Sequence, residues 1–275
     1  MKQFVLSENP DREKIIRFSG DDFRYLVKVR RFAVGEFFPA VLPDGENIFI
    51  QVLSIDNGML TGKCSPLSET ASPDSTASGK LPPIILFQAL AKGDKMDMIV
   101  RQAAEGGITE IVPFVSEFSI AKTDSSGQKF SRWERIIKEA RQQSGSKIAT
   151  SIRRPLKKDE IFEYWKNLKT ESAAAENSAA VPALGFLFHH QGLEQESLHS
   201  YLNIVPKIVT LAVGPEGGFS GNEVSLFLDN GFKPIKIGDT ILRTETAALY
   251  CAAAIKILLL ERDSWELRQV KKNSV

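Results

Sequence analysis

Two glycine-rich loops, each placed after an apolar strand, constrain this sequence more than any other feature. The apolar run 208–213, typical of a strand covered on both faces, ends in the loop 214–218, which reads GPEGG. One helix further on, the run 232–237 ends in a second loop that extends to Thr246. Ligands in open parallel α/β sheets bind outside the carboxyl ends of the strands. We therefore expect both loops to border one ligand site.

The segments around these loops carry helix signals. Ser220 followed by Glu223 matches a capping box, and Gly231 is a suitable stop for the helix between them. Thr244 is expected to cap a final helix that runs to Leu260. Neither loop matches G-x-G-x-x-G or G-x-x-x-x-G-K-[ST], so a dinucleotide or triphosphate pocket of the usual kind is not expected. Taken alone, GPEGG also has the plainer interpretation of a tight turn.

Four segments together resemble a known family. VGPEGGFS at 213–220 and IGDTILRTETAA at 237–248 are similar to the signature pair of the bacterial 16S ribosomal RNA (uridine-N3)-methyltransferases of the SPOUT superfamily. KGDKMDMIVRQAAEGGITEIVPFV at 92–115 resembles the family's K-x-x-x-M-[DE] helix and the strand after it. RWERIIKEARQQS at 132–144 resembles its R-x-x-x-I-x-x-E-A-x-x-Q-S helix. The resemblance spans most of the chain from Phe23 onward.

The resemblance implies an α/β fold with a parallel-sheet trefoil-knot methyltransferase domain that binds S-adenosylmethionine. A knot departs from the general rule that chains are unknotted, and nothing in the periodicity demands it. The cofactor would lie among three loops, and a side chain at Gly217 would occupy space that the ligand needs. The cofactor-binding residues that the resemblance implies are Leu187, Phe188, Gly214, Glu216, Gly217, Gly218, Ile237, Gly238, Ile241 and Leu242.

The implied reaction is methyl transfer to N3 of a uridine in 16S ribosomal RNA. Uridine N3 becomes a nucleophile as it loses its proton, which places negative charge on the neighbouring carbonyl oxygens. Arg243 is the candidate catalytic residue, because its guanidinium stays charged and presents planar donors. Alternatively, Arg243 bonds loop carbonyls or Glu216 and only stabilises the loop. Glu245 is interpreted either as catalytic or as a helix-end carboxylate, and His189 and His190 either as a base or as a polar loop.

The chain divides at a polar segment. The stretch 68–80 is rich in Ser, Thr, Ala and Pro and is interpreted as a linker, which gives domains at 1–70 and 81–275 joined by 71–80. Turn signals in the first domain, above all Asn57-Gly58, predict a small PUA-like β-barrel with a helix at about 21–31. In the second domain, strands alternating with helices predict a parallel sheet. Those strands are expected at 84–90, 110–114, 149–152, 183–188, 208–214 and 232–237.

A basic cluster in the first domain is the candidate RNA-binding surface. Its members are Arg24, Lys28, Arg30 and Arg31. Such a cluster can position phosphates while the nearby Phe23 and Tyr25 stack on unpaired bases. An ordinary salt-bridged surface involving Asp21, Asp22 and Glu36 is the alternative. The sequence departs from the family pattern at Lys2-Gln3, Arg24, Gly106 and Phe118, the last standing where the family usually has Arg, and these departures concern RNA docking.

Composition sets the remaining expectations. Lys and Arg number 35 against 34 acidic residues, so an RNA site must be a local patch. Cys64 and Cys251 are far apart, which indicates a reducing compartment, and we expect a cytoplasmic protein. The longest apolar stretch, 247–260, is too short to span a bilayer, so no membrane association is expected. With three histidines and no suitable Cys spacing, no metal site is expected.

The expected partners are 16S ribosomal RNA or the small ribosomal subunit, and a second copy of the chain. The segment 247–260 is apolar around nearly its whole circumference, which predicts a homodimer through the C-terminal helix. Burial of that helix within one subunit is the alternative. Two other functions stay open from the residues alone. One is a non-catalytic RNA-binding protein on a SPOUT-like scaffold, and the other is a hydrolase or transferase that uses GPEGG as an anion-binding nest.

Overall fold

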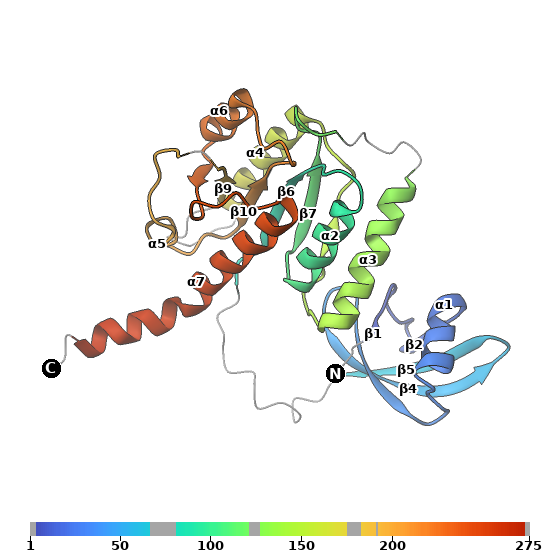
Figure 1. Cartoon of the computed structure of the whole chain (residues 1–275). Helices are drawn as coiled ribbons and strands as arrows, with labels where there is room; N and C mark the ends of the chain where they lie inside the picture. The colour runs from blue at the N-terminus through green and yellow to red at the C-terminus, as the bar shows by residue number, and fades with distance from the viewer. Residues whose placement is uncertain (1–3, 67–80, 121–126, 175–182, 191, 273–275) are drawn as a thin grey trace. The chain divides into compact units, whose positions relative to one another are not determined.

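The protein consists of two compact units, which Figure 1 shows as a computed structural model. The described residues are 4–66, 81–120, 127–174, 183–190 and 192–272. One unit contains residues 1–76 with 141–149, and the other contains 77–140 with 150–275. The predicted linker at 71–80 and the departure at Lys2-Gln3 lie outside the described residues.

The N-terminal unit is built on a five-stranded, mainly antiparallel sheet in the order β1-β3-β4-β5-β2. The predicted hairpin at Asn57-Gly58 is confirmed, since β4 pairs with β5 and both turn residues have positive φ, 49° and 76°. The five strands are β1 (Phe4–Val5), β2 (Ile15–Phe18), β3 (Phe37–Val41), β4 (Asn47–Asp56) and β5 (Met59–Pro66).

The prediction of a β-barrel is not confirmed. Strands β1 and β2 form the two edges of the sheet, and in the described residues no pairing joins them, so the sheet is a half-barrel. A short helix α1 (Gly20–Phe23) continues into the π-helix η1 (Arg24–Val29). Together they cover most of the helix predicted at about 21–31. The aromatic rings of Phe4, Phe18 and Phe38 form the centre of the core under this sheet.

The C-terminal unit contains a six-stranded parallel sheet in the order β11-β9-β10-β6-β7-β8. Its strands are β6 (Ile84–Ala89), β7 (Glu110–Phe114), β8 (Ser151–Ile152), β9 (Leu184–Phe188), β10 (Val209–Val213) and β11 (Lys233–Ile235). Each strand lies within a segment predicted from the sequence, and the predicted parallel arrangement is confirmed. Because the strands are parallel, their carboxyl ends all lie at the same end of the sheet, which we call its carboxyl edge. In the strand order, β10 lies between β6 and β9.

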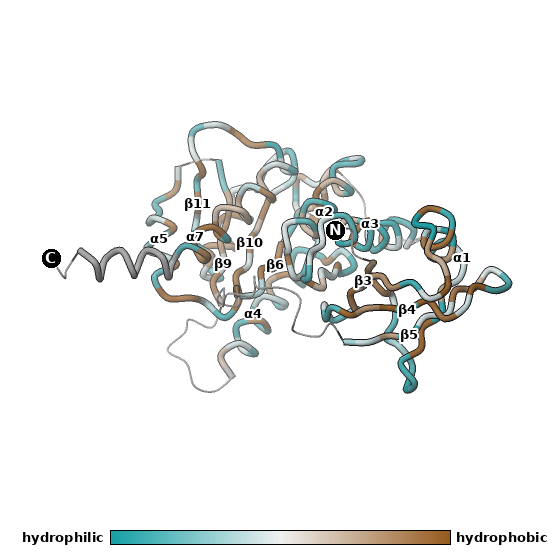
Figure 2. The backbone as a smooth tube through the Cα atoms, turned by 90° about the horizontal axis from the view of Figure 1, so that it is seen from below, coloured by the Kyte–Doolittle hydropathy of each residue, from teal (hydrophilic) through white to brown (hydrophobic). Residues whose placement is uncertain are grey.

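Helices cover both faces of this sheet. They are α2 (Lys95–Glu105), α3 (Gln128–Ser144), α4 (Lys158–Ala174), α5 (Leu198–Tyr201), α6 (Gly221–Asp229) and α7 (Thr244–Lys272). Alternate residues of a strand point to opposite faces. Accordingly, Ile84 and Leu86 pack with α2, α3 and α7, whereas Ile85 and Phe87 pack with α4 and α6. Figure 2 shows the resulting apolar colour along β6 and β10, as expected for strands buried on both faces.

Polar contacts connect the helices that lie on the first face. Asp97 on α2 accepts a hydrogen bond from the indole Nε1 of Trp133 at 3.1 Å and pairs with Arg132 at 2.5 Å. These residues belong to two segments of the family resemblance that are separate in sequence. Lys256 on α7 donates to the carbonyl of Gly106 at 2.6 Å, where a cation is favourable because a helix ends there.

The final helix is longer than predicted. Helix α7 runs from Thr244 to Lys272, whereas the apolar pattern alone predicts an end near Leu260. The additional residues are mostly polar and charged, so hydrophobic periodicity gives no signal there. Among the described residues, no helix combines the length and the apolar character that a bilayer span requires.

Candidate active site

A cavity of about 800 Å³ lies at the carboxyl edge of the parallel sheet. Its walls include the ends of β9 and β11, the loop 214–219 after β10, the segment 236–243 after β11 and the first turns of α7. This is the edge where ligands bind in open parallel sheets. The structure therefore brings together the two glycine-rich loops that the sequence singles out.

Nine of the ten predicted cofactor-binding residues line this cavity. They are Phe188, Gly214, Glu216, Gly217, Gly218, Ile237, Gly238, Ile241 and Leu242. Phe188, Ile237 and Leu242 provide apolar walls, while the glycines carry no side chain and bring the loop backbone close to the cavity. The site thus combines apolar surface with backbone polar groups, as ligand pockets commonly do.

Leu187 is the predicted residue that does not line the cavity. Its side chain is fully buried in the cluster formed with α4 and α6 on the other face of the sheet. Phe188, the next residue of β9, packs toward the cluster of α2, α3 and α7 and reaches the cavity. The strand period of two explains the difference, because neighbouring side chains of a strand point to opposite faces.

A buried hydrogen-bond chain fixes the two loops relative to each other. The hydroxyl of Thr244 donates to the carbonyl of Gly214 at 2.6 Å and accepts from the amide Nε2 of Gln88 at 3.0 Å. Thr244 therefore does not cap α7 as predicted. The carbonyl of Arg243 instead accepts from the N–H groups of Thr246 and Ala247 at 2.9 and 2.8 Å. The start of α7 is thus attached to the ends of β6 and β10.

Glu216 is held by the start of α2. Its Oε1 accepts from the backbone N–H of Lys92 at 3.0 Å and pairs with the ammonium of Lys95 at 2.9 Å. Burial raises the pKa of the Glu216 carboxyl, but the bonds from Lys95 and backbone N–H groups outweigh this effect and lower it overall. The carboxylate is thus ionised and already compensated, so its contacts position the loop.

The glycines of the first loop have different steric surroundings. Gly218 adopts a φ of 72°, which side-chain-bearing residues rarely adopt. A Cβ at Gly217 would lie 3.0 Å from the Cβ of Phe118. A side chain at Gly217 would therefore also meet Phe118, which packs directly on this part of the loop. The expectation that such a side chain would occupy space that the ligand needs stays a prediction, and Gly217 does line the cavity.

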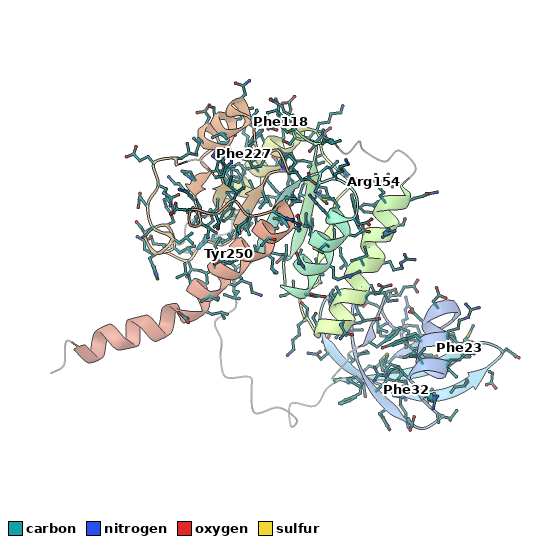
Figure 3. All side chains as sticks on the ribbon, in the orientation of Figure 1. Phe23, Phe32, Phe118, Arg154, Phe227 and Tyr250 are labelled. Atoms are coloured by element: carbon teal, nitrogen blue, oxygen red, sulfur yellow. The ribbon has the colours of Figure 1, made fainter. Side chains whose placement is uncertain are left out.

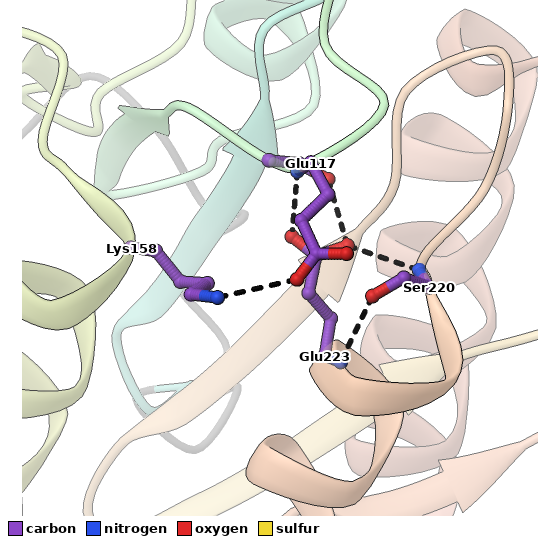
Figure 4. A network of polar contacts seen from close by, with 5 residues as sticks. Glu117, Lys158, Ser220 and Glu223 are labelled. Carbon is purple, nitrogen blue, oxygen red and sulfur yellow. Dashed lines mark hydrogen bonds and ion pairs between the residues drawn. The ribbon is translucent and has the colours of Figure 1, made fainter.

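Glu223 connects this loop to the end of β7, as Figure 4 shows. The carboxylate is 1% exposed and accepts from the Ser116 hydroxyl at 3.1 Å, the Glu117 N–H at 3.0 Å and the Ser220 N–H at 3.0 Å. The predicted capping box is confirmed, since the Ser220 hydroxyl accepts from the Glu223 N–H. Glu223 thus satisfies buried donors from two segments that are far apart in the chain.

Glu117 extends the same network to α4. Its Oε1 accepts from the ammonium of Lys158 at 3.2 Å. The hydrogen bond from Ser220 and the pairing with Lys158 lower the pKa of the Glu117 carboxyl. The loop that leaves β7 is therefore fixed by both its backbone and its side chains.

Arg243 lies on the cavity wall with an exposed side chain. Its backbone is held at the start of α7, but within the described residues its guanidinium makes no hydrogen bond or ion pair. The alternative in which Arg243 bonds Glu216 does not occur in this structure, because Glu216 pairs with Lys95. The guanidinium is therefore available to a ligand.

Three other side chains named from the sequence lie at or near the cavity. His189 and His190 line it, with ring centroids 4.8 Å apart, and His190 lies beside Gly218. Cys251 also lines it, and burial raises the pKa of its thiol, so this cysteine is an unreactive wall residue. Glu245 lies in the first turn of α7 and is absent from the cavity wall.

The basic cluster of the N-terminal unit lies on and after the π-helix. Arg24, Lys28 and Arg31 are exposed, and Arg30 stacks on Phe32 with 5.3 Å to the ring centroid. Arg24 forms a loose ion pair of 3.7 Å with exposed Asp21. Phe23 and Tyr25 are half-buried and pack against the core of this unit, and their stacking on unpaired bases stays a prediction.

No group of three or more His, Cys, Asp and Glu side chains in the described part of the chain is arranged to hold a metal ion. Both cysteines are free, and they lie in different units.

Comparison with known proteins places the chain in a class. The RNA methyltransferase domain family matches residues 79–256. A Synechocystis protein named ribosomal RNA small subunit methyltransferase E is 32% identical over 248 residues, which cover 90% of this chain and 74% of that protein. An Aquifex aeolicus protein of the same name is 34% identical over 174 residues, which cover 62% and 67%.

A solved structure has the same fold. It is a ribosomal RNA small subunit methyltransferase E from Neisseria gonorrhoeae bound to S-adenosylmethionine, with a TM-score of 0.73 and 22% identity over 94% of this chain and 98% of that chain. Fold, site and family match define an RNA methyltransferase. The chain belongs to the small-subunit ribosomal RNA methyltransferase E family.

Sequence reasoning missed several contacts that shape the site. Lys95 and the buried pair of Gln88 and Thr244 hold the loops, and Phe118 packs on Gly217. Gln88 carries a signal that could have been used, because it is a polar residue inside the apolar strand β6 and is fully buried. A buried amide requires a hydrogen-bond partner, which points to a tertiary contact. Lys95 has no such signal, since its partner lies 121 residues away, at Glu216.

Proposed function

We propose that the protein is an S-adenosylmethionine-dependent methyltransferase that methylates N3 of a uridine in 16S ribosomal RNA of the small subunit. The observation that carries this proposal is the cavity in which both signature loops meet beside the exposed guanidinium of Arg243. The family membership identifies the reaction class. A non-catalytic RNA-binding scaffold does not explain why the two loops and Arg243 border one cavity. An anion-binding nest does not explain the apolar walls of that cavity.

The residues present fit the cofactor. The cavity of about 800 Å³ has apolar walls for a flat aromatic ring, from Phe188, Ile237 and Leu242. Gly217 and Gly218 carry no side chain, so a ligand can approach the backbone of this loop closely. The Gly218 N–H closes the bend by donating to the Pro215 carbonyl at 2.9 Å, and Gly218 has a positive φ. We assign the cofactor to the nine lining residues predicted from the sequence.

When bound, S-adenosylmethionine supplies an electrophilic methyl group on a sulfonium. The chain's own contribution is alignment, which is worth roughly 7–11 kcal/mol for a well-oriented displacement. Arg243 directs its donors toward the carbonyl oxygens that gain negative charge as uridine N3 loses its proton, which is stabilisation specific to the transition state. His190, which lines the cavity beside Gly218, is the candidate acceptor of that proton.

The N-terminal unit is proposed to hold the RNA. Arg24, Lys28, Arg30 and Arg31 supply phosphate-binding cations near the π-helix, a type of helix that often marks functional sites. We propose that this unit functions as a PUA-like RNA-binding domain, although its sheet is a half-barrel. We also propose that the segment 71–80 separates the two domains. The trefoil knot of the methyltransferase domain and a cytoplasmic location belong to the same proposal.

We also propose a homodimer formed through α7. This helix exposes large apolar side chains, and their spacing along the helix follows one stripe. They are Leu249, Tyr250, Ile257 and Leu260, and Figure 3 labels Tyr250 on the helix. A contiguous exposed apolar stripe is typical of a protein interface. A dimer would cover this stripe and would place a second chain beside the first turns of α7, which line the cavity.

The proposed function is tested by transfer of labelled methyl groups. Purified protein and S-adenosylmethionine are incubated with small ribosomal subunits from cells that lack the gene, and the RNA is digested and analysed by mass spectrometry. We expect one 3-methyluridine in 16S ribosomal RNA. The same assay with Arg243→Ala should show a large loss of rate. Saturable cofactor binding without any methyl transfer would contradict the enzymatic function.

A further inference from the structure

Phe118 occupies a defined place next to the cavity without forming its wall. It follows β7 by a few residues, so it lies at the carboxyl edge of the sheet with the cavity-lining loops. A Cβ at Gly217 would meet the Cβ of Phe118 at 3.0 Å, but Phe118 does not line the cavity. Its side chain is 49% exposed and Figure 3 labels it on the surface of the C-terminal unit. Phe118 is therefore exposed to solvent beside Gly217, which lines the cavity.

The backbone that carries this ring is rigidly held. Ser116 and Glu117 are the two residues before Phe118. The buried carboxylate of Glu223 accepts hydrogen bonds from the Ser116 hydroxyl and the Glu117 N–H. After it, the Ser119 N–H donates to the Ser116 carbonyl at 3.0 Å, and the Ser119 hydroxyl accepts from the Ser116 N–H at 3.2 Å. Phe118 thus lies inside a closed turn that is fixed to α6.

A single exposed apolar side chain is ordinary on protein surfaces and needs no explanation. Phe118 differs because buried polar groups fix its backbone and because the loop it packs on lines the cavity. Fixing a chain segment costs conformational entropy, and an aromatic ring held in advance loses little more on binding. An exposed aromatic ring on a fixed backbone is suited to stacking against another flat ring.

We infer that the ring of Phe118 stacks on an unpaired base of the RNA that flanks the nucleotide held in the cavity. This inference rests on the proposed function, which brings an RNA strand to this edge of the sheet. Aromatic side chains commonly bind unpaired RNA bases by stacking, and every base has a face that can stack. Because Phe118 lies outside the cavity wall, its partner is the neighbouring base and not the methylated one.

The test uses three variants of the full-length protein with unmethylated small ribosomal subunits. Phe118→Ala removes the side chain, Phe118→Leu keeps apolar volume against Gly217 without a ring face, and Phe118→Trp keeps the ring face. We expect the KM for subunits to rise roughly tenfold for the Ala and Leu variants and to stay close to wild type for Trp. The S-adenosylmethionine affinity measured by calorimetry should be unchanged in all three.

Ile204→Ala is the matched control, since Ile204 is 44% exposed and lies before β10, away from the carboxyl edge. Its kinetics should equal those of the wild type. If Phe118→Ala weakens cofactor binding to the same extent as it raises the KM for subunits, the ring only supports the Gly217 loop. If Phe118→Leu keeps the wild-type KM, no stacking occurs. Either outcome overturns the inference. A wild-type protein that methylates no subunits would instead overturn the proposed function.

Discussion

The hydroxyl of Thr244 donates to the carbonyl of Gly214 at 2.6 Å, which joins the first residue of α7 to the loop after β10. The same hydroxyl accepts from the buried amide of Gln88. Both signature loops thus depend on one oxygen atom. Their relative position, and with it the shape of the cavity, is set by a contact between residues that are 30 positions apart.

Thr244→Val should weaken both the fold and the cofactor site. Valine has nearly the same shape but leaves the Gln88 amide without one partner, and an unsatisfied buried polar group costs about 1–3 kcal/mol. We expect the free energy of unfolding to fall by that amount in denaturant titrations, together with weaker S-adenosylmethionine binding in calorimetry. Thr246→Val, at an exposed position in the same turn, is the control and should change neither.

Arg243→Ala should lower turnover by about a hundredfold to a thousandfold while cofactor affinity changes little. Loss of one donor that stabilises a developing negative charge typically has this effect. The exposed, unpaired position of the guanidinium among the described residues means that its removal leaves no buried group unsatisfied. Arg243→Lys keeps the charge without the planar donors and should be intermediate. Equal losses in turnover and cofactor affinity would make Arg243 a cofactor ligand.

Substitutions of the loop glycines should differ by position. Gly218→Ala imposes a side chain at a φ of 72°, so we expect strain and loss of cofactor binding. Gly217→Val should displace Phe118, which lies 3.0 Å from the new Cβ, and impair RNA methylation as well as the loop. Gly221→Ala has open space around the new Cβ and serves as the control. Calorimetric titration with S-adenosylmethionine distinguishes the three; equal affinity in all of them would contradict the assignment of the loop.

Tyr164 should make the C-terminal unit less stable at high pH. Burial and the hydrogen bond from its hydroxyl to Glu110 raise its pKa to about 12, from about 10 in an unfolded chain. Because the folded pKa is raised, this contribution is fully present below pH about 10 and is lost as pH rises through about 12. Tyr164→Phe should lower the free energy of unfolding by about 1 kcal/mol at pH 8. The free energy of unfolding of this variant should also fall less steeply above pH about 10 than that of the wild type.

Denaturant titrations at a series of pH values measure this effect. Tyr25→Phe, in the N-terminal unit, is the control, since the Tyr25 hydroxyl has no hydrogen bond to another described residue. An equally steep alkaline decline in Tyr164→Phe would assign the transition to other groups.

Ala253→Glu should convert the proposed homodimer to monomers. Ala253 is exposed on α7, in line with Leu249 and Ile257, so a carboxylate there would have to be buried in the proposed interface. Sedimentation at micromolar concentration should show twice the 30.5 kDa chain mass for wild type and a shift toward one chain mass for the variant. Asn167→Glu on exposed α4 should leave the dimer intact. A fully active wild-type monomer would contradict the interface.

Much of the parallel sheet could be predicted from the sequence because its strands are apolar runs bounded by turn signals. The segments containing β6, β7 and β10 are of this kind, and the structure places strands in all of them. The capping box at Ser220 was equally readable, since it depends on residues close together in the chain. The half-barrel was not, because closure of a sheet depends on whether β1 meets β2, and local patterns carry no information about that pairing.

The candidate site shows the same division. The glycine-rich loops and Arg243 were recognisable from local sequence, but the partners that hold them were not. Lys95 binds Glu216 and Gln88 binds Thr244 across more than a hundred positions, so only the assembled sheet brings them together. Leu187 was placed in the site because it precedes Phe188, and only the observed strand register shows that it points to the other face.

The position of β10 between β6 and β9 has a consequence for how this protein is made. Residues 209–213 must pair with a strand that leaves the ribosome more than a hundred residues earlier, so β6 and β7 emerge with one long edge open. Contacts of such high sequence separation slow folding, and an uncovered apolar edge attracts other chains. We expect the C-terminal unit to acquire its structure only near the end of synthesis, when β10 and β11 become available. The cavity would then be the last part of the molecule to form, and truncation just before residue 209 should yield aggregates instead of a smaller folded domain.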